Sequence, residues 1–167
     1  SFVDWEPIDT YIVRAADVRK VRPASSKDSL EQKDKMLAGE AVQFLTQQNP
    51  HAVFVYFGQV DEVGHRDGFH PSVPSYLQAL HTVDAHVASL VKAIQSRPEY
   101  LAENWLVVIS TDHGGRGRKH RGGHDVPEIV TTFLVVSGKD SMRGEIEEPS
   151  YIVDVPVIAL THLGIPI

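Results

Sequence analysis

The fold is decided by residues 52–65, which read Ala52-Val53-Phe54-Val55-Tyr56-Phe57-Gly58-Gln59-Val60-Asp61-Glu62-Val63-Gly64-His65. Residues 52–57 form an apolar run rich in β-branched and aromatic side chains, which is typical of a strand buried on both faces. The spacing of apolar residues predicts a helix over residues 26–48, which Asn49-Pro50 stops. A polar, glycine-containing loop is expected over residues 58–74, directly after the strand.

The alternation of helix and strand continues toward the C-terminus. Apolar residues at helical spacing predict a long helix over residues 74–95. Two further apolar runs, residues 105–110 and 131–136, predict buried strands, and a glycine-rich basic loop over residues 111–127 separates them. Because helices alternate with buried strands, we expect an α/β fold with a largely parallel sheet flanked by helices.

The two ends of the chain carry weaker patterns. Residues 1–25 are expected to be irregular, with a short strand around Tyr11-Ile12-Val13. A final helix is predicted over residues 153–163, where Asp154 can cap the start and Gly164 the end.

Composition narrows the class of protein. The chain has 167 residues with a formal net charge of −6, which suits one domain over residues 1–167. The global charge argues against a nucleic-acid partner, because nucleic-acid binders usually show a basic excess. No apolar run approaches the ~20 residues that span a bilayer, so no membrane partner is expected. No signal peptide is visible either, which leaves the compartment open.

Histidine and aspartate point to a metal site. The chain has no cysteine, which excludes disulfides and thiolate ligands, and seven of its nine histidines lie between residues 61 and 124. Asp61 and His65 follow one predicted strand, and Asp112, His113 and His120 follow the next. Ligands of α/β sheets gather at the carboxyl ends of strands. Five mixed carboxylate and imidazole ligands suit two divalent metals about 3.5–4 Å apart, with Zn favoured and Mn possible.

These loops resemble a known family. Asp-x-x-Gly-His at residues 61–65, followed by Thr-Asp-His-Gly-Gly-x-Gly-x-x-His at residues 111–120, is similar to the alkaline phosphatase superfamily. Within it, the likeness is to the type I phosphodiesterase / nucleotide pyrophosphatase branch, and it extends over residues 50–167. The resemblance implies an alkaline-phosphatase-like fold and a hydrolase of small phosphate esters that uses two divalent metals and a Ser or Thr nucleophile.

The motifs also assign roles to individual residues. The resemblance implies two metal sites, one held by Asp61, His65 and His120 and the other by Asp112 and His113. His124 is an alternative to His120, because in the family Gly-Gly follows this histidine directly, whereas here Arg121 intervenes. Arg116 and Arg118 lie in the basic run of the second loop and are candidates for binding an anionic ester, although a solvated loop explains the run equally well.

One part of the family pattern has no match. The nucleophile and a further metal-binding aspartate come from an upstream segment in the family, and Asp4, Asp9 and Thr10 are the only early candidates here, in a context that does not fit. We therefore interpret residues 1–167 as the C-terminal metal-binding part of a larger domain, incomplete at its N-terminus. Such a part is expected to pair with its missing half or with itself. A sulfatase, a phosphomutase or an inactive metal-binding fragment remain alternatives.

Overall fold

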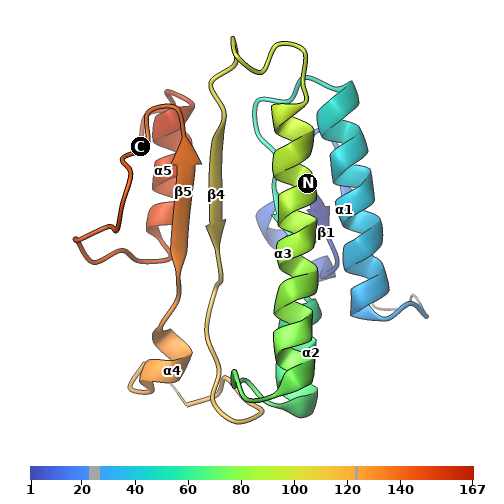
Figure 1. The fold of residues 1–167 in the computed structure, drawn as a ribbon, viewed down its shortest axis with the longest axis vertical. Coiled ribbons are helices and arrows are strands. Elements are labelled where there is room, and N and C mark those ends of the chain that lie inside the picture. Colours follow the sequence, from blue (N-terminus) through green and yellow to red (C-terminus); the bar gives the residue numbers. More distant parts are fainter. Residues whose placement is uncertain (23–26, 123) are drawn as a thin grey trace.

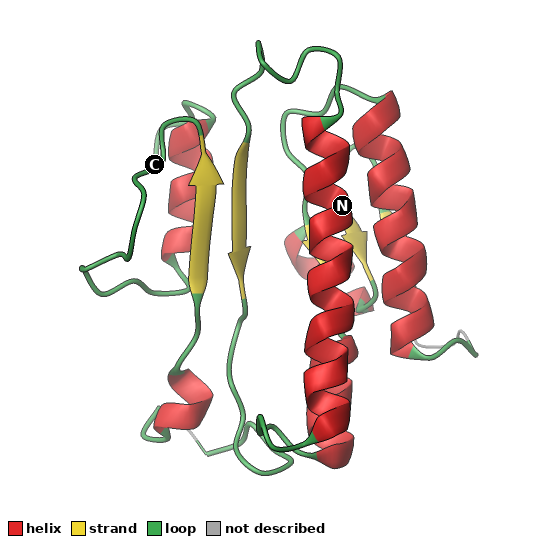
Figure 2. Cartoon of the chain, viewed as in Figure 1, coloured by secondary structure: helices red, strands yellow, loops and turns green. Residues whose placement is uncertain are grey.

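The computed structural model describes residues 1–22, 27–122 and 124–167 (Figures 1 and 2). A three-stranded sheet has the order β2-β1-β3, and all of its pairs are parallel. Its strands are β1 (Phe2–Val3), β2 (Lys20–Val21) and β3 (Val55–Tyr56). Helices pack beside this sheet, so the predicted α/β class with a parallel sheet flanked by helices is confirmed.

The N-terminal region differs from the prediction. The expected strand around Tyr11-Ile12-Val13 is wrong, because Ile8–Ile12 forms a short π-helical turn. The strands β1 and β2 are two residues long and are held by pairing with segments far away in the sequence. Strands this short leave no periodic pattern that a sequence window could detect.

Two long helices form the larger part of the core. Helix α1 (Leu30–Gln47) begins with a capping box in which Ser29 and Gln32 bond each other's backbone. The earlier start predicted at residue 26 lies outside the described residues. Helix α3 (Pro74–Gln95) has the predicted bounds and lies along α1 (Figure 1). Phe2 of β1 packs with Leu37 and Ala41 of α1 in one buried cluster. Leu45 of α1 packs with Ala93 and Ile94 of α3 in a second.

The segment between β3 and α3 is a helix and not the predicted loop. Helix α2 spans Gln59–Asp67 and ends at Gly68, whose φ of 126° turns the chain away. Its N-cap residue, Gly58, provides no side-chain cap, so no local start signal is present. The preceding strand is also shorter than predicted: β3 covers two residues, and Phe54 is 43% exposed instead of buried.

The C-terminal region forms a second sheet. Strand β4 (Leu106–Ser110) pairs with β5 (Leu134–Gly138) in antiparallel register, so the predicted parallel sheet does not extend to this pair. A short helix, α4 (Pro127–Val130), precedes β5, and helix α5 (Asp154–His162) packs against β4.

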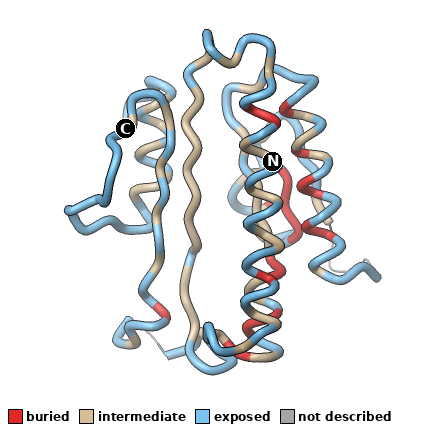
Figure 3. Tube along the Cα trace, viewed as in Figure 1, coloured by how far each residue is buried: buried red, intermediate tan, exposed pale blue. Residues whose placement is uncertain are grey.

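Burial along β5 alternates, which corrects the prediction of a strand buried on both faces. Phe133 and Val135 remain about half exposed on one side of the ribbon. Figure 3 shows the same contrast, with buried segments around α1 and its neighbours and mostly intermediate or exposed residues along β4 and β5. Within the described residues, the helices lack the length and apolarity that crossing a membrane requires.

Candidate metal centre

Two buried carboxylates fix the start of α2. The Gly58 N–H donates to Asp4 Oδ2 at 3.1 Å, and the Gln59 N–H donates to Asp34 Oδ2 at 3.0 Å. Asp4 directly follows β1, and Asp34 lies on α1. Distant side chains thus accept the free N–H groups that a local cap would otherwise bond. Asp61 lies in the first turn of the helix that they hold.

The carboxylate pair retains a proton near neutral pH. Burial and the neighbouring Asp4 carboxylate raise the pKa of Asp34 to about 8. Burial also raises the pKa of Asp4, which hydrogen-bonds to Asp34. Two adjacent buried carboxyl groups cannot both ionise without strong repulsion, which favours the protonated form of Asp34 near neutral pH.

The second ligand segment folds back on itself after β4. Gly114 N–H donates to the Ile129 carbonyl at 2.7 Å, which ties the segment to α4. Arg116 and Lys119 then exchange backbone hydrogen bonds around Gly117, whose φ of 61° favours glycine. This tight turn returns the chain toward its start, where His120 is brought against His113.

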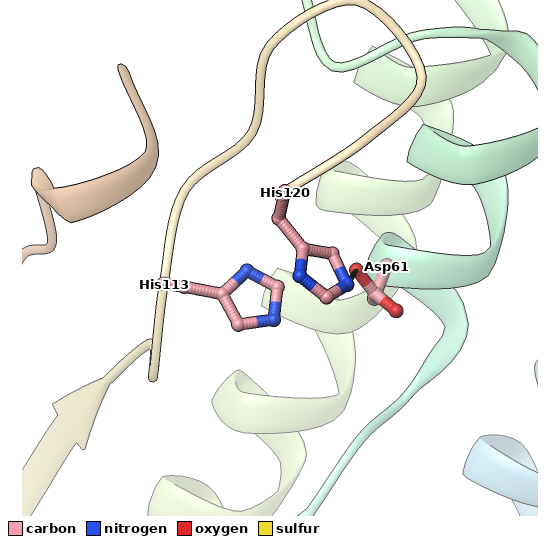
Figure 4. Close-up of side chains that lie close together, drawn as sticks. All are labelled: Asp61, His113 and His120. Atoms are coloured by element: carbon pink, nitrogen blue, oxygen red, sulfur yellow. Dashed lines mark ion pairs between the residues drawn. The ribbon is translucent and has the colours of Figure 1, made fainter. Parts of the chain in front are cut away.

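The turn brings Asp61, His113 and His120 together (Figure 4). One donor atom from each residue lies within 4.8 Å of the others. The imidazole rings of His113 and His120 stack with centroids 4.1 Å apart, and His120 Nε2 lies 4.0 Å from Asp61 Oδ1. That oxygen is buried and has no hydrogen-bond partner among the described residues. One carboxylate and two imidazoles that converge in this way fit the donor set of a zinc or manganese site.

The remaining predicted ligands border this cluster. His65 Nε2 lies 3.5 Å from Asp61 Oδ2, and its other ring nitrogen lies 2.9 Å from the Arg118 carbonyl oxygen. Asp112 Oδ2 lies 3.7 Å from His113 Nε2, with most of the carboxylate exposed. The five residues therefore form one continuous group. His113 lies with Asp61 and His120 and also stays beside Asp112.

The other candidates lie farther out. His124 is exposed in a turn, and the cluster found within the described residues contains His120 instead. Arg116 is exposed, with its Nε 4.0 Å from Glu128. Arg118 is also exposed, although its backbone carbonyl contacts His65.

The electrostatic field favours a cation. Burial raises the pKa of the Tyr56 hydroxyl, and the Asp112, Asp4 and Asp61 carboxylates raise it further. Burial is the larger cause, and the carboxylate contribution reports negative potential, because that potential opposes ionisation of the phenol. Carboxylates from three separate segments therefore act on the same region, where a divalent cation would offset their charge.

Sequence reasoning missed Asp34 and Phe69. Asp34 occupies a core position of α1, three residues before the buried Leu37. An acidic residue on the apolar side of a helix is unusual, and it could have been recognised from the sequence as a buried polar contact. Phe69 contacts both ligand segments through Gly64 and Gly115. Its neighbours in sequence offered no such signal.

The comparisons with known proteins give one family. No curated protein and no solved structure matches the chain. The family model for type I phosphodiesterase / nucleotide pyrophosphatase matches residues 5–139, which is more than half of the chain and includes Asp61 and His120. These residues, taken with the motifs that contain them, show that the chain belongs to the type I phosphodiesterase / nucleotide pyrophosphatase family.

Proposed function

We propose that this chain forms the metal-binding part of a hydrolase that cleaves phosphate esters, with phosphodiesters as the preferred substrate class. The observation that carries the proposal is the convergence of Asp61, His113 and His120 within 4.8 Å. Membership of the phosphodiesterase family supports a phosphoester hydrolase in the coarser sense. The cluster supports metal dependence, because bound cations assist such chemistry.

Asp61, His113 and His120 would hold one divalent cation, zinc or manganese. When bound there, the cation supplies Lewis-acid polarisation of a phosphoryl oxygen. His65, beside Asp61, would add a donor to this cation, and Asp112, beside His113, would contribute to a second cation. Asp61 Oδ1 supports this assignment, because it is buried and accepts no hydrogen bond from the described residues. Such an oxygen raises the free energy of the folded protein until a cation or a proton binds to it.

The basic turn would orient the ester. Arg116 and Arg118 are exposed and lie on the same turn that delivers His120. The Arg118 backbone touches His65, so this turn borders the ligand cluster directly. Guanidinium groups pair bidentately with phosphate oxygens, which suits them to bind the anionic part of a substrate beside the cation.

The attacking hydroxyl is proposed to come from outside residues 1–167. The contacts of the early candidates favour this choice. Asp9 is buried in an ion pair with Arg19, and Thr10 lies in the same π-helical turn. Asp4 is engaged in holding the start of α2.

Hydrolysis assays on the protein expressed from its complete gene test this function. We expect bis-p-nitrophenyl phosphate to be cleaved after addition of Zn²⁺ or Mn²⁺ and expect a chelator to abolish the activity. His120→Ala should remove the activity, whereas the exposed His51→Ala serves as the matched control and should retain it.

Two outcomes would count against the proposal. If neither bis-p-nitrophenyl phosphate nor p-nitrophenyl phosphate is cleaved with any of several divalent metals, the hydrolase assignment is wrong. If hydrolysis persists undiminished in His120→Ala, the activity does not depend on this cluster. Cleavage of the monoester alone would retain the hydrolase and replace the diester preference.

A further inference from the structure

The aromatic ring of Phe69 lies between the two segments that carry the candidate ligands. A Cβ atom added to Gly64 would lie well under 3.0 Å from the Phe69 ring, and so would one added to Gly115. Real Cβ atoms essentially never approach this closely, so both glycines leave room for the ring. Gly64 belongs to α2, and Gly115 belongs to the segment after β4.

Further contacts hold the ring in this position. The Phe69 N–H donates to the Gly117 carbonyl at 2.7 Å, which joins the end of α2 to the basic turn. The His65 ring meets Phe69 edge-on with centroids 5.3 Å apart, and the Tyr76 ring from α3 meets it at 5.8 Å. Edge-to-face pairs at these distances are favourable and geometrically specific.

We propose that Phe69 is the positioning residue of the metal centre and sets the separation between its two ligand segments. This inference rests on the proposed function. Gly64 lies one helical turn after Asp61, and Gly115 lies two residues after His113. A ring that contacts both glycines therefore determines how far Asp61 stands from His113.

The physical basis is close packing. Protein interiors are packed as densely as organic crystals, so a change of even one methylene is transmitted to neighbouring groups. A metal site tolerates little displacement, because its donors must stay near 2.0–2.2 Å from the ion. Groups that orient ligands without touching the metal typically contribute about 10–100-fold to metal affinity.

Zinc affinity of the complete protein tests the proposal. We expect Phe69→Ala and Phe69→Leu to weaken Zn²⁺ binding by about 10–100-fold, measured by competition with a chromophoric chelator. The thermal unfolding midpoint of the metal-free protein is recorded alongside. A purely structural role would lower that midpoint and leave the zinc affinity of the folded protein unchanged, so the two measurements separate the roles.

Paired substitutions make the test specific to the contact. Gly115→Ala should weaken zinc binding, because the new Cβ displaces the ring. Adding Phe69→Leu to Gly115→Ala should recover part of the loss, since the smaller side chain makes room. Gly39→Ala is the matched control, because a Cβ at Gly39 meets nothing within 4 Å, and it should bind zinc like the unmodified protein.

The outcomes separate this inference from the proposed function. If the unmodified protein binds neither Zn²⁺ nor Mn²⁺, the proposed function fails and the inference fails with it. If the unmodified protein binds zinc and the Phe69 variants bind it equally well, only the inference is overturned. The same holds if Gly115→Ala weakens binding and Phe69→Leu gives no recovery. Should Phe69→Ala not fold, Phe69→Leu and the paired variant decide the matter.

Discussion

The Asp34 carboxylate accepts a hydrogen bond from the backbone N–H of Gln59, and both residues are buried at the start of α2. This contact joins α1 to the helix that carries Asp61, across 25 positions of sequence. The pKa of Asp34 is raised to about 8 at this position, so its protonation state affects the stability of the folded protein. Stability and the geometry of the metal centre are therefore linked through one side chain.

The first prediction concerns the pH dependence of stability. The pKa of Asp34 is 3.8 in its ordinary state and about 8 in the folded protein. The folded state thus binds more protons between these values, and the free energy of unfolding should fall as pH rises from about 4 through about 8. Thermal unfolding midpoints of the metal-free protein, measured in steps from pH 5 to 9, check this direction.

Asn at position 34 should flatten that dependence. Asp34→Asn keeps an acceptor for the Gln59 N–H and a donor toward Asp4, as the protonated acid does. Its unfolding midpoint should vary less with pH than that of the unmodified protein. The exposed Asp17→Asn serves as control and should leave the slope unchanged. A slope that persists in Asp34→Asn would show that another group titrates.

The second prediction distinguishes the two candidate histidines. His120 lies in the cluster with Asp61, whereas His124 is exposed in a turn. Loss of a direct ligand should cost more than the roughly 10–100-fold that outer groups contribute to metal affinity. His120→Ala should therefore lose zinc binding by more than about 100-fold in a chelator competition, and His124→Ala should stay near the unmodified value. The reverse order would assign the ligand to His124.

The third prediction concerns Arg97, which joins α3 to the end of α1. Its guanidinium donates to the carbonyls of Leu45 and Gln48 and to both carboxylate oxygens of Glu103, and it lies over the Trp105 ring. Hydrogen bonds to charged groups typically contribute about 1.5–3 kcal/mol. Arg97→Ala should therefore lower the free energy of unfolding by at least about 1.5–3 kcal/mol in urea titrations.

The same ion pair gives a second pH window. Arg97, and after it the Trp105 N–H, lower the pKa of Glu103 from 4.5 to about 2. A lowered carboxyl pKa contributes stability that is present above 4.5 and is lost as pH falls toward 2. Arg97→Ala should reduce this acid sensitivity, and the remainder should reflect the Trp105 N–H. An equal acid sensitivity in both proteins would contradict the assignment.

The fourth prediction contrasts two neighbouring glycines. A Cβ at Gly114 would overlap the Glu128 backbone carbonyl, whereas one at Gly115 would meet the Phe69 side chain. Overpacking typically costs about 1–3 kcal/mol. Both alanine variants should be destabilised to this degree in denaturant titrations, but only Gly115→Ala should be rescued by Phe69→Leu. Rescue of both, or of neither, would place the Phe69 ring elsewhere.

The sequence was most informative where the signal is local. The bounds of α3 match the prediction, because Pro74 suits the first helical turn and the apolar stripe continues to Ile94. The end of α5 is likewise set by Gly164, whose φ is 68°. The family membership is confirmed. It was predicted from short motifs that are recognisable in the sequence alone.

Prediction failed where distant groups replace a local signal. Helix α2 was predicted as a loop because its cap comes from Asp4 and Asp34, and neither residue lies within 20 positions of Gly58. Strand β5 was predicted to be buried on both faces because its apolar residues are contiguous in sequence. Its pairing with β4 leaves alternate side chains exposed.

The sequence by itself determined the family, the α/β class and the candidate ligands, because these depend on residue types at fixed spacing. Only the tertiary structure decided that His113 joins Asp61 and His120 in one cluster. That grouping depends on a turn at Gly117, on the helix that Asp34 holds and on the Phe69 ring between the two segments. Each of these contacts joins residues by packing or hydrogen bonding through space, which the spacing of a motif does not encode.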